Sequence, residues 1–156
     1  MRIRQRTVID RAPAQVWPHV IRPESFQRWN EKISRLDAHG EFRVGQPFTT
    51  HYLWRGKALQ CASIPTEIQP ERLLELRHSA VVGPGVPPNL EIRQRITLQP
   101  RGARTVVSKL ISIENHGMPW YLRALVAFVT RFGAPVGPDP LKVLCEAEPS
   151  HARRSP

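Results

Sequence analysis

The chain has 156 residues, 40% of them apolar and 23% charged, a balance that is typical of one globular domain. Its apolar runs are far shorter than the roughly 20 residues that span a bilayer, so the composition excludes disordered, collagen-like and transmembrane proteins. The unusual quantity is the charge, because 23 Lys and Arg against 13 Asp and Glu give a net charge of +10. Such an excess bears on attraction to nucleic acid or anionic membranes and not on the fold.

The N-terminal part is predicted to form one strand and two short helices. Residues 2–10 carry β-branched side chains among arginines, which favours a strand. Pro13 then begins a helix whose apolar side chains recur at helical spacing until Pro23 interrupts the pattern. A second short helix is expected at about residues 23–28.

From residue 32 the period of the apolar side chains changes to two, which predicts six consecutive strands. Glycine- or proline-containing turns separate them, and strands joined by short turns pair as an antiparallel meander. With the first strand, a sheet of six to seven strands is expected. The six strands are expected near residues 32–39, 47–55, 57–69, 71–79, 89–99 and 103–113.

The C-terminal part is predicted to be mainly helical. Apolar side chains are dense from Met118 to Phe132, which predicts a long helix buried over a wide arc, with Trp120 and Tyr121 in the core or on a cavity wall. Prolines and glycines at 133–140 break this helix, and a shorter helical piece is expected at about 140–147. One domain is therefore expected over residues 1–148, followed by a flexible tail at 149–156.

The histidines and cysteines of the sequence do not form a metal-binding motif. The six histidines lack HxH or HxxxH spacing, and Cys61 and Cys145 are far apart. No metal and no cofactor are therefore expected. The first ten residues, MRIRQRTVID, have no apolar stretch typical of a secretory signal, and together with the cysteine usage this favours a cytoplasmic location.

Two segments of the sequence contain recognisable phrases. Residues 8–30, VIDRAPAQVWPHVIRPESFQRWN, contain an Ile-Asp-x-Ala-Pro type phrase, a Val-Trp pair and a later Trp, and residues 45–76 contain a Pro-x-x-Leu step at Pro70. The first segment resembles the opening, and the second the next three strands, of the polyketide cyclase/dehydrase branch of the START-like (SRPBCC) superfamily. The resemblance implies an α+β helix-grip fold, in which a curved antiparallel sheet wraps around a long C-terminal helix. The break at 133–140 departs from the usual continuous helix, and we interpret it as a hinge at the mouth of a cavity.

The resemblance also implies an apolar cavity between the sheet and the long helix, and it supplies no catalytic residues because the superfamily has no universal catalytic motif. Alternation along the strands assigns a set of side chains to the cavity wall. Gln94 and His78 would be polar groups on an otherwise apolar face and would need a ligand, an ordered water or a neighbouring side chain as partner. The predicted ligand-binding residues are Phe48, Tyr52, Trp54, Gln60, Leu74, Leu76, His78, Ile92, Gln94, Ile96, Phe128 and Phe132.

Three hypotheses about function follow. The first is binding, or binding and transformation, of an apolar or amphipathic small molecule such as a lipid, polyketide, quinone or aromatic compound. The second is a basic interaction module for RNA, the ribosome or an anionic membrane, which requires Arg55, Arg77, Arg93 and Arg95 to gather on one face. The third is a cyclase or dehydratase, in which His78 or Tyr52 would have to reach a bound substrate.

Overall fold

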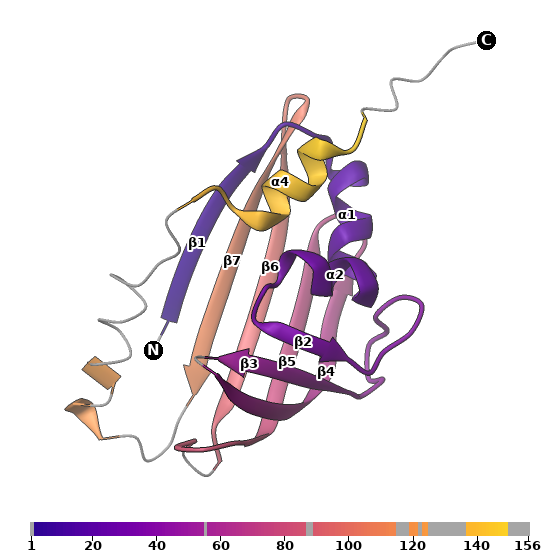
Figure 1. Cartoon of the computed structure of the whole chain (residues 1–156). Coiled ribbons are helices and arrows are strands. Elements are labelled where there is room, and N and C mark those ends of the chain that lie inside the picture. Colours follow the sequence, from indigo (N-terminus) through magenta and orange to yellow (C-terminus); the bar gives the residue numbers. More distant parts are fainter. Residues whose placement is uncertain are drawn as a thin grey trace.

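The protein has the order of elements expected of a helix-grip domain. A computed structural model describes residues 2–54, 56–86, 89–114, 119–121, 123–124 and 137–149. Two short helices follow the first strand, six strands follow them, and a helix lies near the C-terminus (Figure 1). The elements are β1 (Arg2–Ile9), α1 (Pro13–Ile21), α2 (Pro23–Trp29), β2 (Ile33–Leu36), β3 (Phe48–Trp54), β4 (Lys57–Gln69), β5 (Leu73–Val82), β6 (Glu91–Arg101), β7 (Arg104–Glu114) and α4 (Pro140–Ala147).

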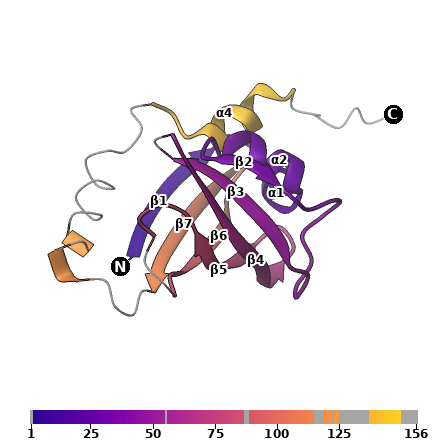
Figure 2. The same cartoon turned by 60° about the horizontal axis from the view of Figure 1, so that its bottom comes forward.

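The strands form one seven-stranded antiparallel sheet in the order β1-β7-β6-β5-β4-β3-β2. Strands β2 to β7 make the predicted meander, and β1 adds to its end by pairing with β7. The sheet is strongly curled, and α1, α2 and α4 lie together at one end of it (Figures 1 and 2). The predicted class, strand number and two short helices are therefore confirmed.

The C-terminal prediction is confirmed in one part and wrong in another. The short helix expected at 140–147 is α4. Most of the long helix predicted at 118–132 lies outside the described residues, as does the tail from residue 150. Trp120 and Tyr121 are described and helical, but they expose 79% and 58% of their surface. These two side chains pack edge to face with ring centroids 6.2 Å apart, and neither is buried in a core.

One face of the sheet packs against the helices, and we call it the inner face. Leu74, Leu76 and Ile96 on its central strands are 0–1% exposed and lie in the same apolar cluster as the helix residues Val16 and Val20. Complete burial of each such side chain stabilises the fold by about 1.5–3 kcal/mol. The core is therefore located between one end of the inner face and the three helices.

A buried ion pair joins α4 to the inner face. Asp139 caps α4 by accepting a hydrogen bond from the backbone N–H of Leu141 at 2.9 Å. Lys109 Nζ on β7 donates to both carboxylate oxygens at 2.9 and 2.8 Å, and Thr7 Oγ1 on β1 donates at 2.9 Å. The same Lys109 Nζ lies 4.6 Å from the ring centroid of Trp29 on α2. Burial opposes ionisation of Asp139, but the hydrogen bonds and charge of Lys109 keep the pKa of this carboxyl below its ordinary value.

Replacement of Asp139 by alanine is expected to lower the free energy of unfolding by about 3 kcal/mol, because it leaves the Lys109 ammonium buried without a counter-charge. Equilibrium unfolding in urea measures the loss. The control is Asp37→Ala, which removes an exposed carboxylate paired with Arg35 and His51 and should have a much smaller effect. Equal losses in the two variants would show that the buried pair does not secure α4.

Candidate functional site

The inner face has two halves that differ in how well they are covered. The half beneath α1, α2 and α4 is largely buried, whereas the half away from these helices has several half-buried apolar and polar side chains around the buried His78. We call the second region the distal half. Its residues, which come from β3, β5, β6 and β7, are Tyr52, His78, Ile92, Gln94, Ile111 and Ile113.

The turn between β3 and β4 decides which side chains of β4 face inward. Trp54 pairs with Lys57 across a two-residue turn, so odd positions of β4 lie opposite even positions of β3. Ser63 is therefore inward and 0% exposed, whereas Gln60 is exposed on the outer face. The prediction that Gln60 faces inward is wrong, because it assumed that even-numbered residues face inward in β4 as they do in β3.

Register shifts in β4 alter this pattern further along the strand. The pairing of β4 with β5 shifts between Gln60 and Ala62 and again between Pro65 and Glu67. After the second shift the even-numbered Ile68 packs against the core. One β-bulge thus moves an entire set of side chains from one face to the other within a single strand.

A chain of hydrogen bonds runs across the inner face from β3 to β5. Thr50 Oγ1 and Ser63 Oγ are 2.7 Å apart, and Ser63 Oγ is 2.7 Å from His78 Nδ1. Cys61 Sγ lies nearby, 3.7 Å from Ser63 Oγ and 3.9 Å from His78 Nδ1. Thr50, Ser63 and His78 are 1%, 0% and 3% exposed, so this polar chain is shielded from bulk solvent.

The second ring nitrogen of His78 is buried and has no hydrogen-bond partner among the described residues. Burial lowers the pKa of His78 to about 4, and the Gln94 side chain acts in the opposite direction without a well-formed hydrogen bond to Nε2. The imidazole is therefore neutral at physiological pH. A buried polar atom without a partner is rare in native proteins, so its presence here needs a physical reason.

Tyr52 lies beside this histidine. The two rings meet edge to face with centroids 6.4 Å apart. Burial raises the pKa of the Tyr52 hydroxyl well above its ordinary value, and the neighbouring Cys61 thiol acts in the same direction. Tyr52 is therefore protonated at neutral pH and is available as a hydrogen-bond donor.

The arrangement is suited to hydrogen bonding and poorly suited to nucleophilic catalysis. Ser63 and His78 are spaced like a nucleophile and its base, but a histidine with a pKa of about 4 is a weak base near neutral pH. Burial also raises the pKa of the Cys61 thiol, although Ser63 and Thr50 partly oppose this shift, so the sulfur stays protonated. These groups can instead orient a bound polar group.

The structure brings together four of the predicted site residues and separates the others. Tyr52, His78, Ile92 and Gln94 meet in the distal half, whereas Phe48, Leu74, Leu76 and Ile96 belong to the core beneath the helices. Phe128, Phe132 and the side chain of Trp54 lie outside the described part of the chain. Sequence reasoning missed Ser63, Ile111 and Ile113 as site residues. The Arg55-Gly56 turn is the signal that could have placed Ser63 correctly.

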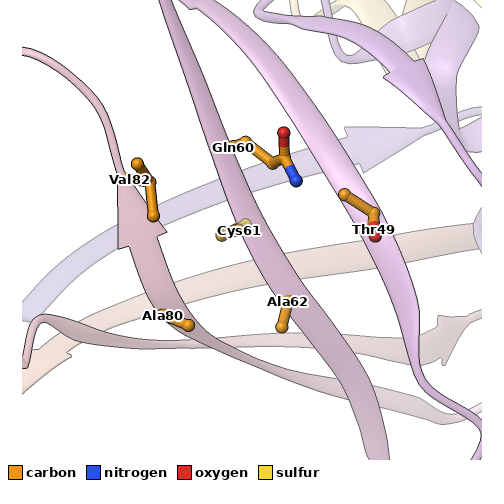
Figure 3. Close-up of a pocket in the computed structure, with 6 residues that line it drawn as sticks. All are labelled: Thr49, Gln60, Cys61, Ala62, Ala80 and Val82. Carbon is orange, nitrogen blue, oxygen red and sulfur yellow. The ribbon is translucent and has the colours of Figure 1, made fainter.

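A pocket of about 320 Å³ lies elsewhere, on the outer side of the sheet (Figure 3). It lies between β3, β4 and β5, next to Ala80, whose φ of 50° accompanies the register shift between β4 and β5. This pocket is not the predicted cavity between the sheet and the long helix. Its lining residues are Thr49, Gln60, Cys61, Ala62, Ala80 and Val82.

Arginines also gather on the outer face. The strand register puts Arg77, Arg93 and Arg95 there, and β1 adds Arg2, Arg4 and Arg6 to the same face, whereas Arg55 is not described. Acidic side chains neutralise part of this charge. Arg95 pairs with Glu75 at 3.1 Å and Arg93 reaches Glu75 at 4.0 Å.

The curled sheet, the paired short helices and the C-terminal helix define a helix-grip fold, the fold of START-like proteins. Within that class, the family model described as "Activator of Hsp90 ATPase homolog 1-like protein" matches residues 10–112, and the chain belongs to this family. The suspected resemblance is thus confirmed at the level of the superfamily. No curated protein matches the sequence.

Several solved structures share the fold. Protein MLL2253 from Mesorhizobium loti is 18% identical, with a TM-score of 0.68 over 94% of this chain and 97% of that one. A START superfamily protein from Mycobacterium smegmatis is 11% identical, with a TM-score of 0.66 over 93% and 97% of the two chains. The protein Ara h 8.0201 is 11% identical, with a TM-score of 0.65 over 95% and 99%. In the described part of this chain, no helix is long and apolar enough to cross a membrane.

The buried imidazole predicts a specific dependence of stability on pH. Because the pKa of His78 is about 4 in the folded protein and near 6.5 in the unfolded chain, the unfolded chain binds more protons between these pH values. The stability contributed by neutral His78 is therefore present above pH 6.5 and lost as the pH falls through 4. In His78→Gln, the free energy of unfolding should fall less steeply over this window, by up to about 1.4 kcal/mol per pH unit.

Urea unfolding at a series of pH values measures this slope. The control is His39→Gln, an exposed histidine whose removal should leave the wild-type slope unchanged. Parallel pH profiles for the wild type and His78→Gln would contradict burial of a neutral imidazole.

Proposed function

We propose that the protein binds an apolar or amphipathic small molecule against the distal half of the inner face. The observation that carries this proposal is the buried Nε2 of His78, which has no partner among the described residues and lies within a half-buried apolar surface. Ligand sites combine a mainly apolar wall with a few polar groups that fix orientation, and Ile92, Ile111 and Tyr52 supply such a wall. Binding would cover this wall and give the imidazole its missing partner.

The family supports the same proposal. Helix-grip domains of the START-like superfamily typically bind hydrophobic ligands, and this chain shares their sheet and helices. Ligand binding requires no catalytic residue, which agrees with the weak basicity of His78 and the protonated Cys61. Binding without an obligatory reaction is therefore the function best suited to these groups.

Substitution of Ile92 by asparagine is expected to weaken binding of 2-naphthol at least tenfold, because it puts an amide into the apolar wall beside His78. The matched control is Leu110→Asn, an aliphatic side chain of similar exposure on the adjacent strand but on the outer face. Fluorescence titration gives both affinities, and native mass spectrometry of the purified protein shows whether a ligand is retained. Equal affinities in the two variants would place binding elsewhere.

The arginines of the outer face support a second candidate function, binding of a phosphate-bearing polyanion. Six arginines on three strands share this face, and none of Arg2, Arg4, Arg6 and Arg77 has an ion pair with another described residue. Glu75 and Glu67 partly neutralise Arg93 and Arg95. The strongest basic contribution would therefore come from β1, at the edge of the sheet.

The double substitution Arg4→Glu with Arg6→Glu is expected to reduce binding to a single-stranded RNA oligonucleotide and to make it less dependent on salt. The slope of log affinity against log salt should become shallower by about 0.7 for each phosphate that the protein no longer neutralises. Arg28→Glu with Arg43→Glu, at exposed positions away from this face, is the control with the same change of charge. An equal effect of both pairs would contradict a defined site on the outer face, and vesicles of anionic lipid in place of RNA test the membrane alternative.

A further inference from the structure

We propose that the distal half selects an uncharged hydroxyl group on its apolar ligand, through Nε2 of His78 held in place by Ser63 and Thr50. This inference rests on the proposed small-molecule binding and adds the chemical class of the group that is recognised. It assigns a positioning role to Ser63 and Thr50.

The orientation of the imidazole is fixed from both sides. Ser63 lies directly opposite His78 on β4, and its Oγ is 2.7 Å from Nδ1. Ile92 lies directly opposite His78 on β6, and Tyr52 packs edge-on against the ring. Because Nδ1 is engaged, Nε2 is the nitrogen left for a ligand, and the ring cannot exchange the two nitrogens without breaking its hydrogen bond with Ser63.

The charge of the surroundings favours an uncharged ligand group. Among inward-facing positions of the described strands, the charged side chains are Lys109, which is paired with Asp139, and Lys57 at the tip of the β3–β4 hairpin. On the described strands, a carboxylate beside His78 would find no counter-charge to replace its lost hydration, and an ammonium group would find no acid. The arginines of the outer face are on the opposite side of the sheet and cannot compensate either.

The hydrogen-bond chain can run in either direction, and this favours a hydroxyl group over a carbonyl group. If Ser63 donates to Nδ1, then Nε2 carries the proton and donates to the ligand. If Nδ1 donates to Ser63, which donates to Thr50, then Nε2 accepts from the ligand. A hydroxyl group both donates and accepts, so it satisfies Nε2 in either tautomer. A carbonyl group can only accept, so it satisfies Nε2 only in the tautomer in which Nε2 carries the proton.

Three probes of one shape test the inference: naphthalene, 2-naphthol and 2-naphthoate, each titrated into the full-length protein at pH 7. 2-Naphthol is uncharged at this pH, as the tyrosine phenol is, and 2-naphthoate is a carboxylate. We expect 2-naphthol to bind about five- to tenfold more tightly than naphthalene, as one additional hydrogen bond provides, and more tightly than 2-naphthoate. In His78→Phe this preference should vanish while naphthalene still binds.

A second variant and a direct measurement keep the test decisive if His78→Phe does not fold. Ser63→Ala frees Nδ1 and should reduce the preference for 2-naphthol, whereas Ser108→Ala, on the outer face of β7, should not. In the unmodified protein, the ¹⁵N resonance of His78 Nε2 should shift when 2-naphthol binds and remain unchanged with naphthalene.

The outcomes separate the two proposals. Equal binding of naphthalene and 2-naphthol, or tighter binding of 2-naphthoate, would overturn recognition of a hydroxyl group and leave small-molecule binding intact. Failure of all three probes to bind would count against the proposed function itself and overturn this inference with it. Preference for 2-naphthol that depends on His78 and Ser63 would support both.

Discussion

The inner face of the curled sheet must be covered, and the rest of the structure depends on how this is done. A sheet with one apolar face is stable in water only when that face packs against another layer. Here α1, α2 and α4 cover one half, where Leu74 and Ile96 are completely buried. The buried Lys109–Asp139 pair joins α4 to β7 and adds direction to an otherwise apolar contact. These three helices therefore create a closed core at one end of the sheet, and the other end contains the proposed ligand site.

The distal half supports the proposed ligand binding, because it keeps polar groups where packing alone would favour apolar ones. The hydrogen-bonded series Thr50, Ser63 and His78 lies within the sheet, and its last nitrogen has no described partner. A neutral buried imidazole stabilises the fold less than an aliphatic side chain of similar size would, because its polar atoms lose their hydration. The arrangement makes sense for a site that a ligand completes. The same low polarity that lowers the pKa of His78 would strengthen a hydrogen bond to that ligand.

Membership of the family of activator of Hsp90 ATPase homolog 1-like proteins establishes the fold. It does not identify the ligand, which depends on the side chains of the site. The three solved structures named above are 11–18% identical to this chain, a range in which the backbone is kept while most side chains differ. Ligand choice in such a domain depends on a few inward-facing residues. In the site proposed for this chain, the polar side chains are His78, Gln94 and Tyr52, with Ser63 and Thr50 behind them.

The sequence by itself determined the strands, the short helices and the superfamily. The two-residue period of apolar side chains in strands and the prolines at helix starts are local signals, which can be recognised without the tertiary structure. The sequence also placed Tyr52, His78, Ile92 and Gln94 on one face correctly. Only the tertiary structure decided that Leu74 and Ile96 lie beneath helices while Ile92 does not, and that Trp120 and Tyr121 are exposed. The facing of Gln60 and Ser63 was also decided there, since a two-residue turn and two bulges set the register. A shift of one residue reverses every side chain of a strand, so face depends on pairing between segments and not on the strand alone.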